Sequence, residues 1–86
     1  MSHSVEFTAA AARQLRKLDR AVRVRLLAAI GDLVEDARPV TATKLVGEQT
    51  AWHIQVGDRR VIYDVLDQAL VVTVDRAGHR RDVHDR

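Results

Sequence analysis

Hydrophobic and polar positions alternate in the second half of the chain, in segments 51–56, 59–66 and 69–76. Alternation with a period of two is typical of β-strands with one buried face. Gly57-Asp58 separates the first two segments and favours a two-residue hairpin turn, in which the glycine supplies a positive φ. Asp67-Gln68 predicts a second turn, with a weaker signal. The pattern therefore predicts a three-stranded antiparallel meander.

The two predicted turns fix which residues lie opposite each other. The first turn pairs Ile54 with Val61, and the second pairs Val61 with Val74. Paired residues of an antiparallel sheet share a face. One predicted face is apolar and holds Trp52, Ile54, Val56, Val61, Tyr63, Val65, Leu70, Val72 and Val74. The other is largely polar and holds His53, Gln55, Arg60, Ile62, Asp64, Thr73 and Asp75, with Arg60 opposite Asp75.

The first half of the chain predicts a short strand at Val5–Phe7 and then two helices. Thr8 and Asp19 are suitable caps for the helix starts. Apolar residues recur at a helical spacing up to Ala37, and Pro39 is expected to end the second helix. Helices joined this closely fold back as a hairpin, which we expect to cover the apolar face of the sheet. The polar residues 40–50 are expected to form a connecting loop, and the polar face is expected to stay uncovered.

The length of 86 residues favours one domain spanning residues 1–86, with an α+β fold. The chain has no cysteine, which excludes disulfides, thiol chemistry and cysteine-based zinc sites. The start of the sequence lacks the pattern of a signal peptide. No apolar run approaches the ~20 residues that span a bilayer. We therefore expect a cytoplasmic protein with no membrane partner.

Arginine is concentrated in two parts of the sequence. Residues 76–86 contain four arginines and two histidines against two aspartates, although the net charge of the chain is only +2. A second basic set lies on the predicted helices, at Arg13, Arg16, Lys17, Arg20, Arg23 and Arg25. Clustered arginine favours a polyanionic partner, either nucleic acid or an acidic peptide. For the helix set, we favour the simpler explanation that exposed helix faces are charged for solubility.

The polar face and the basic tail together carry the residue types that RNA cleavage without a metal requires. Arginines bind phosphate through forked, charge-assisted hydrogen bonds. His53 or His84 can transfer a proton near neutral pH, while a 2′-OH attacks the adjacent phosphate. A simpler interpretation also stands: an antiparallel sheet can have one wet face, and an Arg60–Asp75 ion pair would need no further function.

Other chemistry finds little support in the sequence. His79, Asp82 and His84 do not have the spacing of a common metal site, so we expect no metal. The glycines are scattered and form no phosphate-binding loop, and no cofactor is expected.

Three segments carry a resemblance to a known family. They are "KLVG" at Lys44–Gly47, "WHIQVGDRRVIY" at Trp52–Tyr63 and "GHRRDVH" at Gly78–His84. With the predicted order of elements, they resemble the RelE/ParE toxins of bacterial toxin–antitoxin systems, over nearly the whole chain. The resemblance implies a small sheet flanked by a helical hairpin. It also implies an mRNA endonuclease that acts in the ribosomal A site, a cognate antitoxin, and contact with operator DNA through that antitoxin.

The resemblance also implies roles for individual residues. Arg60 and Arg80 match the arginines that bind the scissile phosphate. His84 stands where the family usually has a tyrosine, and His53 and Gln55 stand where active members carry basic residues. His53 as base and His84 as acid would give a histidine version of the reaction. The expected RNA contacts are Lys44, Gln55, Arg76 and Arg81.

These departures leave three functions open. The first is a ribosome-dependent mRNA endonuclease. The second is a non-enzymatic inhibitor of DNA gyrase of the ParE kind. The third is a catalytically degenerate member that acts only through its antitoxin.

Overall fold

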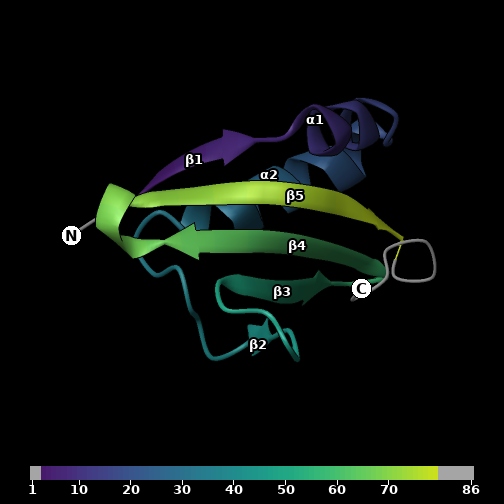
Figure 1. Cartoon of the computed structure of the whole chain (residues 1–86). Helices are drawn as coiled ribbons and strands as arrows, with labels where there is room; N and C mark the ends of the chain where they lie inside the picture. Colours follow the sequence, from purple (N-terminus) through teal and green to yellow (C-terminus); the bar gives the residue numbers. More distant parts are fainter. Residues whose placement is uncertain (1–2, 80–86) are drawn as a thin grey trace.

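The computed structural model describes residues 3–79 of the chain (Figure 1). Two helices and a five-stranded mixed sheet confirm the α+β fold, and β1 pairs in parallel with the last strand. The strand order across the sheet is β1-β5-β4-β3-β2. In chain order the elements are β1 (Ser4–Phe7), α1 (Ala9–Arg16), α2 (Arg20–Asp32), β2 (Thr43–Lys44), β3 (Ala51–Val56), β4 (Arg59–Leu66), a 3₁₀ turn η1 (Asp67–Ala69) and β5 (Val71–His79).

The start of α1 is capped as predicted. The hydroxyl of Thr8 accepts a hydrogen bond from the Ala11 amide at 3.1 Å, which satisfies one of the amides left open at a helix start. Asp19 occupies the N-cap position of α2, but among the described residues its side chain makes no capping hydrogen bond.

The second helix is shorter than predicted, because α2 ends at Asp32 and not at Pro39. The amide of Leu33 bonds the carbonyl of Ile30, and this shorter i→i+3 spacing tightens the last turn and ends the helix. Leu33 and Ala37 are still buried as their spacing predicted, but the backbone reaches them through turns.

The apolar face of the sheet packs on both helices, as expected. The buried core joins the helix residues Ala11, Leu15, Leu26 and Ile30 to the sheet residues Ile54, Val61, Tyr63, Val65, Val72, Val74 and Ala77. In Figure 1 α2 lies behind the sheet, and α1 lies above β5, beyond the end of β1. Tyr63 is fully buried and its hydroxyl donates to the Ala37 carbonyl at 2.8 Å, so this phenol fixes the segment that follows α2. Burial also raises the pKa of Tyr63 to about 12.

The register of β5 against β4 differs from the prediction. The turn is the three-residue η1 followed by Leu70 in the left-handed conformation (φ 55°), so Leu70 lies outside the strands and not on the apolar face. Tyr63 consequently pairs with Val74 and not with Val72. A shift of two residues preserves the face of every side chain, because the side-chain period of a strand is two. The predicted apolar face therefore persists despite the wrong turn.

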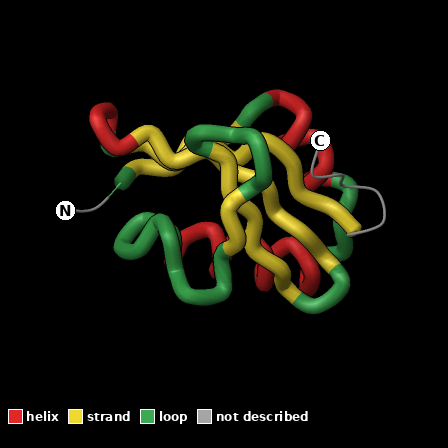
Figure 2. Tube along the Cα trace, turned by 60° about the horizontal axis from the view of Figure 1, so that its bottom comes forward, coloured by secondary structure: helices red, strands yellow, loops and turns green. Residues whose placement is uncertain are grey.

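The segment predicted as a loop, residues 40–50, contains β2, which pairs with β3 at the edge of the sheet. The rest of the connection between α2 and β3 is loop (green in Figure 2). Leu45 packs with Ala51 and Ile62 in a small second cluster on the face away from the helices. The expectation that this face is uncovered is therefore wrong at its centre, where Leu45 shields Ile62 to 6% exposure.

Candidate functional site

The face of the sheet away from the helices, called here the outer face, brings the predicted polar residues together in neighbouring rows. One row runs from Gln55 on β3 to Arg60 on β4, and the next runs from His53 through Ile62 to Arg76 on β5. Residues two apart on a strand are separated by roughly 6.6 Å along its axis. Four of the predicted site residues, His53, Gln55, Arg60 and Arg76, therefore share one patch.

Arg76 joins the outer face only because of an irregularity in β5. Simple alternation after Val74 would turn Arg76 toward the helices. The register shifts between Ile62 and Tyr63, so that Arg76 pairs with Ile62 and Ala77 takes the buried position opposite Val61. The extra residue of such a bulge re-aims the side chains that follow it.

Side chains from the helical layer hold the bulge in place. The strand β1 pairs with β5 only as far as Val74, so the backbone beyond it needs other partners. Thr8 donates its hydroxyl proton to the Asp75 carbonyl at 2.9 Å, and the Ala77 amide donates to the side-chain oxygen of Gln14 at 2.8 Å. The first helix and its N-cap thereby position a residue of the candidate site.

His53 and Arg60 are half-buried on this face. The atoms Nδ1 of His53 and Nε of Arg60 are shielded from solvent. The two-residue shift from the turn and the bulge together change the neighbour of Arg60: it lies opposite Gly78 and not opposite Asp75, so the predicted cross-strand Arg60–Asp75 pairing is wrong. Glycine leaves the side of β5 next to Arg60 without a side chain.

Sequence reasoning missed a pair of carboxyl groups on the outer face. Burial, together with a hydrogen bond and repulsion from Asp64, raises the pKa of Asp75 to about 7. The Thr50 hydroxyl donates to Asp64 at 2.7 Å. Two carboxyls this close favour sharing one proton, so Asp75 changes its charge near neutral pH. The sequence placed both aspartates on one face, but the assumed Arg60–Asp75 pairing concealed their contact.

Other predicted residues are not part of this patch. Lys44 pairs with Trp52, whose side chain faces the helices, and its ammonium donates to the Gln49 carbonyl at 2.9 Å. It therefore closes its own loop at the edge of the sheet. Three further residues of the predicted site, Arg80, Arg81 and His84, lie outside the described residues.

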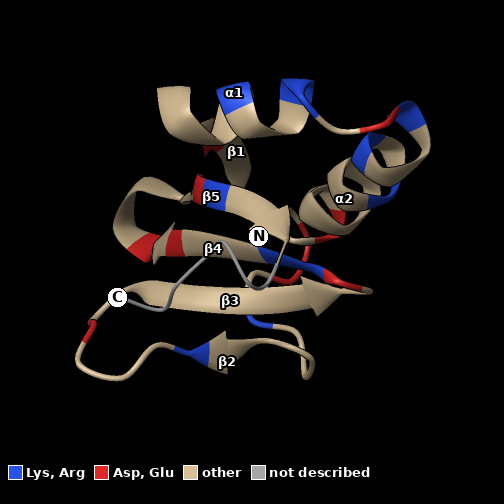
Figure 3. Cartoon of the chain, turned by 90° about the vertical axis from the view of Figure 1, so that its right-hand side faces the viewer, with Lys and Arg blue, Asp and Glu red and all other residues tan. Residues whose placement is uncertain are grey.

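Positive charge marks one end of the molecule. Figure 3 shows Lys and Arg on both helices and at the end of β4 that follows the β3–β4 turn. The strand β5 ends at His79, which pairs with Arg59 at that same end. The residues after His79 therefore start from the basic end of the sheet.

Between residues 3 and 79, no three His, Asp or Glu side chains gather in a way that would hold a metal ion. Neither helix within those residues has the length and hydrophobicity that spanning a bilayer requires.

Comparisons with known proteins agree on one superfamily. Residues 5–84 match the family described as the ParE toxin of the type II toxin–antitoxin system parDE. A search of curated proteins found no match.

The fold also matches chains of solved toxin–antitoxin structures. The RelBE2 complex of Mycobacterium tuberculosis contains a chain that is 27% identical, with a TM-score of 0.81, covering 93% of this chain and 100% of the other. A chain of the intact RelBE complex of E. coli is 28% identical, with a TM-score of 0.81, and the match covers 91% of this chain and 96% of the other. A chain of the archaeal RelE–RelB complex of Pyrococcus horikoshii is 24% identical, with a TM-score of 0.82, and the match covers 96% of this chain and 100% of the other. This likeness shows the shared fold.

Proposed function

The chain belongs to the ParE toxin family of type II toxin–antitoxin systems, and we propose that it acts by cutting mRNA on the ribosome. The observation that supports this activity most is the patch on the outer face. It joins the cations Arg60 and Arg76 to the titratable side chain of His53 on rigid strands. Sites built on strands hold their groups more precisely than sites built on loops.

In the proposed reaction, Arg60 binds the scissile phosphate and stabilises the negative charge that develops on it. The 2′-oxygen of the preceding ribose forms a bond to phosphorus, and the bond from phosphorus to the 5′-oxygen breaks. His53 accepts the 2′-hydroxyl proton. Because its Nδ1 is shielded, the transfer uses Nε2. Arg80 and His84, whose roles come from the family resemblance, supply a second cation and the acid that protonates the 5′-oxygen.

The proposed partners follow from the same assignment. The similar chains come from complexes of RelE with RelB, an antitoxin, and we propose that this chain likewise binds a cognate antitoxin. The ribosome and its mRNA are the proposed target, which places the activity in the cytoplasm. Contact with operator DNA would occur through the antitoxin.

The test is expression of the chain and of Arg60→Ala in bacteria, with growth and mRNA 5′ ends recorded. The wild-type chain should arrest growth and cut messages only while they are translated, and Arg60→Ala should lose both effects. Arg13→Ala is the matched control, because Arg13 is exposed on α1. An Arg60→Ala variant that stays fully toxic would show that the site is wrongly assigned.

Inhibition of DNA gyrase is the second candidate. The matched family is described as the ParE toxin, and the ParE kind of toxin is the one expected to inhibit gyrase. The replacement of expected basic residues by His53 and Gln55 also favours a non-enzymatic mode. Induction of the DNA-damage response, with messages left intact, would select this function. A chain that is not toxic in either assay would be a degenerate member that acts through its antitoxin alone.

A further inference from the structure

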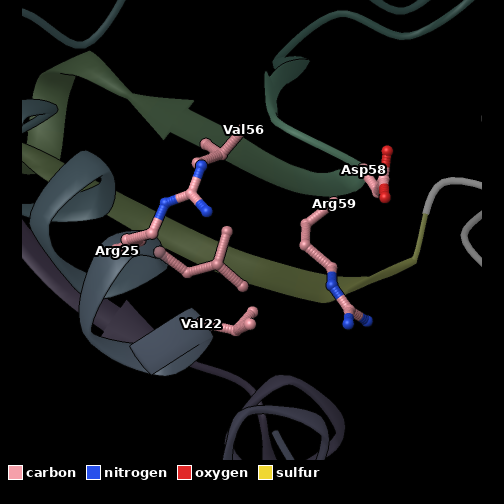
Figure 4. A pocket seen from close by; sticks show the side chains of 6 residues that line it. Val22, Arg25, Val56, Asp58 and Arg59 are labelled. Carbon is pink, nitrogen blue, oxygen red and sulfur yellow. The ribbon is translucent and has the colours of Figure 1, made fainter. Parts of the chain in front are cut away.

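A surface that the proposed reaction does not use lies on the side of α2 that faces away from the sheet. Figure 4 shows the opposite side of this helix, from which Arg25 extends toward Val56 in the β3–β4 hairpin. With 3.6 residues per turn, the side turned away from the sheet carries residues three and four apart. They are Val24, Leu27, Ala28 and Gly31, all exposed, and are called here the exposed face of α2.

The exposed face of α2 is apolar. Val24 is 55% exposed and Leu27, one turn later, is 42% exposed. A Cβ atom placed on Gly31 in the next turn would meet nothing within 4 Å, so the helix surface is open there. The other side of α2 buries Leu26 and Ile30 against the sheet. A helix that is apolar on both sides is typically covered on both sides, so we expect a partner over the exposed face.

Charged residues flank this face with opposite signs at its two ends. Arg20 begins α2, whereas Asp32 ends it and Glu35 follows in the next turns, and all three are exposed. Within residues 3–79 none of the three makes an ion pair. The first turn of α2 has no acidic residue and the last turn has no basic one, which is the reverse of what a helix dipole favours. Contacts within the chain therefore do not explain these charges.

A second copy of the chain fits the exposed face when its α2 runs antiparallel to the first. A two-fold axis beside Leu27 and Ala28 would bring each of these residues against its own counterpart. Val24 of each copy would then lie over Gly31 of the other, and a large side chain opposite a small one packs without a void. Two-fold symmetry of this kind is the commonest arrangement of protein subunits.

The same arrangement accounts for the charges. Arg20 of each copy would face Glu35 of the other, and each helix end would lie beside the opposite end of the partner helix dipole. A nucleic acid or an anionic membrane would instead need cations along the whole face, and it would meet Asp32 and Glu35 at one end. The second copy is the partner that supplies both signs of charge.

We propose that the chain forms a two-fold symmetric dimer in which the exposed faces of two antiparallel α2 helices pack together. One pair of helices buries less area than a standard interface, so we expect a weak dimer that dissociates in the micromolar range. Since α2 lies on the helix side of the sheet, the outer faces of both copies would remain uncovered. The dimer does not depend on the proposed cleavage.

Cysteine cross-linking tests the position of the two-fold axis. The chain has no cysteine of its own, so a single introduced cysteine reports one contact. Under mild oxidation Ala28→Cys should form a disulfide-linked dimer, because the two copies of residue 28 lie beside the axis. Ala21→Cys is the matched control: Ala21 is also exposed on α2, but its counterpart would lie about 20 Å away along the helix, outside disulfide reach. Equal cross-linking of the two variants would overturn the proposal.

Charge exchange tests the antiparallel arrangement, with association measured by sedimentation velocity from micromolar to millimolar concentration at low salt. Arg20→Glu and Glu35→Arg should each weaken dimerisation about fivefold to tenfold. The double variant Arg20→Glu/Glu35→Arg should recover the wild-type affinity. Roughly 20 Å along the helix separates the two residues within one chain, so only contact between copies explains a recovery. Arg13→Glu, on the exposed surface of α1, is the control that should not change dimerisation, and circular dichroism melting reports folding.

The remaining outcomes decide between partners. Leu27→Glu should abolish the dimer. A wild-type chain that stays monomeric at millimolar concentration, or a double charge variant no better than the single ones, would overturn the proposal. A monomeric chain in which Leu27→Glu prevents co-purification of the co-expressed antitoxin would assign the face to the antitoxin instead.

The growth and mRNA assays separate this proposal from the proposed function. A monomeric chain that cuts mRNA overturns the dimer alone. A dimeric chain that neither arrests growth nor cuts mRNA overturns the cleavage function alone.

Discussion

Asp75→Asn should stabilise the protein at alkaline pH. In the folded protein the carboxyl of Asp75 has a pKa of about 7, against an ordinary value of 3.8, because of burial and the neighbouring Asp64. The folded state therefore holds this proton more tightly than the unfolded chain does. The stabilisation from the proton is complete below the ordinary value and is lost as the pH rises to about 7. Asparagine is neutral throughout and avoids that loss.

The magnitude follows from the interval between the two pKa values of Asp75, 3.8 and about 7. At 1.36 kcal/mol per pH unit the interval corresponds to about 4 kcal/mol. Asp75 is only half-buried, and solvent screens much of the repulsion, which leaves about 1–2 kcal/mol. At pH 8 the free energy of unfolding of Asp75→Asn should exceed the wild-type value by about 1–2 kcal/mol. Near pH 4.5 the difference should be only a few tenths of a kcal/mol.

Urea denaturation followed by circular dichroism at the two pH values measures this difference. Asp58→Asn is the matched control, since Asp58 is exposed in the β3–β4 turn, and it should change stability by less than about 0.5 kcal/mol. A ¹³C NMR titration of the wild type should show one aspartate with a midpoint near 7, and Asp64→Asn should lower it. The explanation fails if Asp75→Asn is no more stable than the wild type at pH 8, or if its advantage is equal at both pH values.

Two further predictions concern the contacts that support the site. Tyr63→Phe removes the buried hydrogen bond to the Ala37 carbonyl and should lower the free energy of unfolding by about 1–3 kcal/mol in urea denaturation, without changing the fold. Thr8→Ala removes both the bond from the Ala11 amide and the bond to the Asp75 carbonyl, and should cost about 1–2 kcal/mol. Thr8→Ser keeps both bonds and should behave as the wild type. Equal stabilities of the alanine and serine variants would contradict the assigned role.

Alternation and helical spacing were sufficient to predict the order of the elements apart from β2, and the faces of the residues in β3, in β4 and in β5 as far as Asp75. The Gly57-Asp58 turn gave the β3–β4 register correctly, since a two-residue turn with glycine leaves few alternatives. The β4–β5 turn has no glycine to indicate its type. Leu70 adopts a left-handed conformation there, which cannot be predicted from a leucine. The faces of Val72 and Val74 were still predicted correctly, because the register shift from this turn is two residues.

Helix and strand ends were predicted less well, because partners distant in sequence decide them. Ala37 is buried as its spacing predicted, yet it follows turns after α2, where its carbonyl meets the phenol of Tyr63. The short strand β2 exists only because β3 lies beside it, and two residues give no periodicity to detect.

Some residues of the candidate site could likewise be placed from the sequence, and others could be placed only from the tertiary structure. The sequence by itself determined that His53, Gln55 and Arg60 share the face away from the helices, because alternation within one well-defined hairpin fixes it. Only the tertiary structure placed Arg76 beside them, through a bulge held by Thr8 and Gln14. A one-residue shift reverses the face of everything that follows, and contacts from a separate layer decide whether it occurs. The proton shared by Asp64 and Asp75 has the same origin, because burial and proximity between strands raise the pKa.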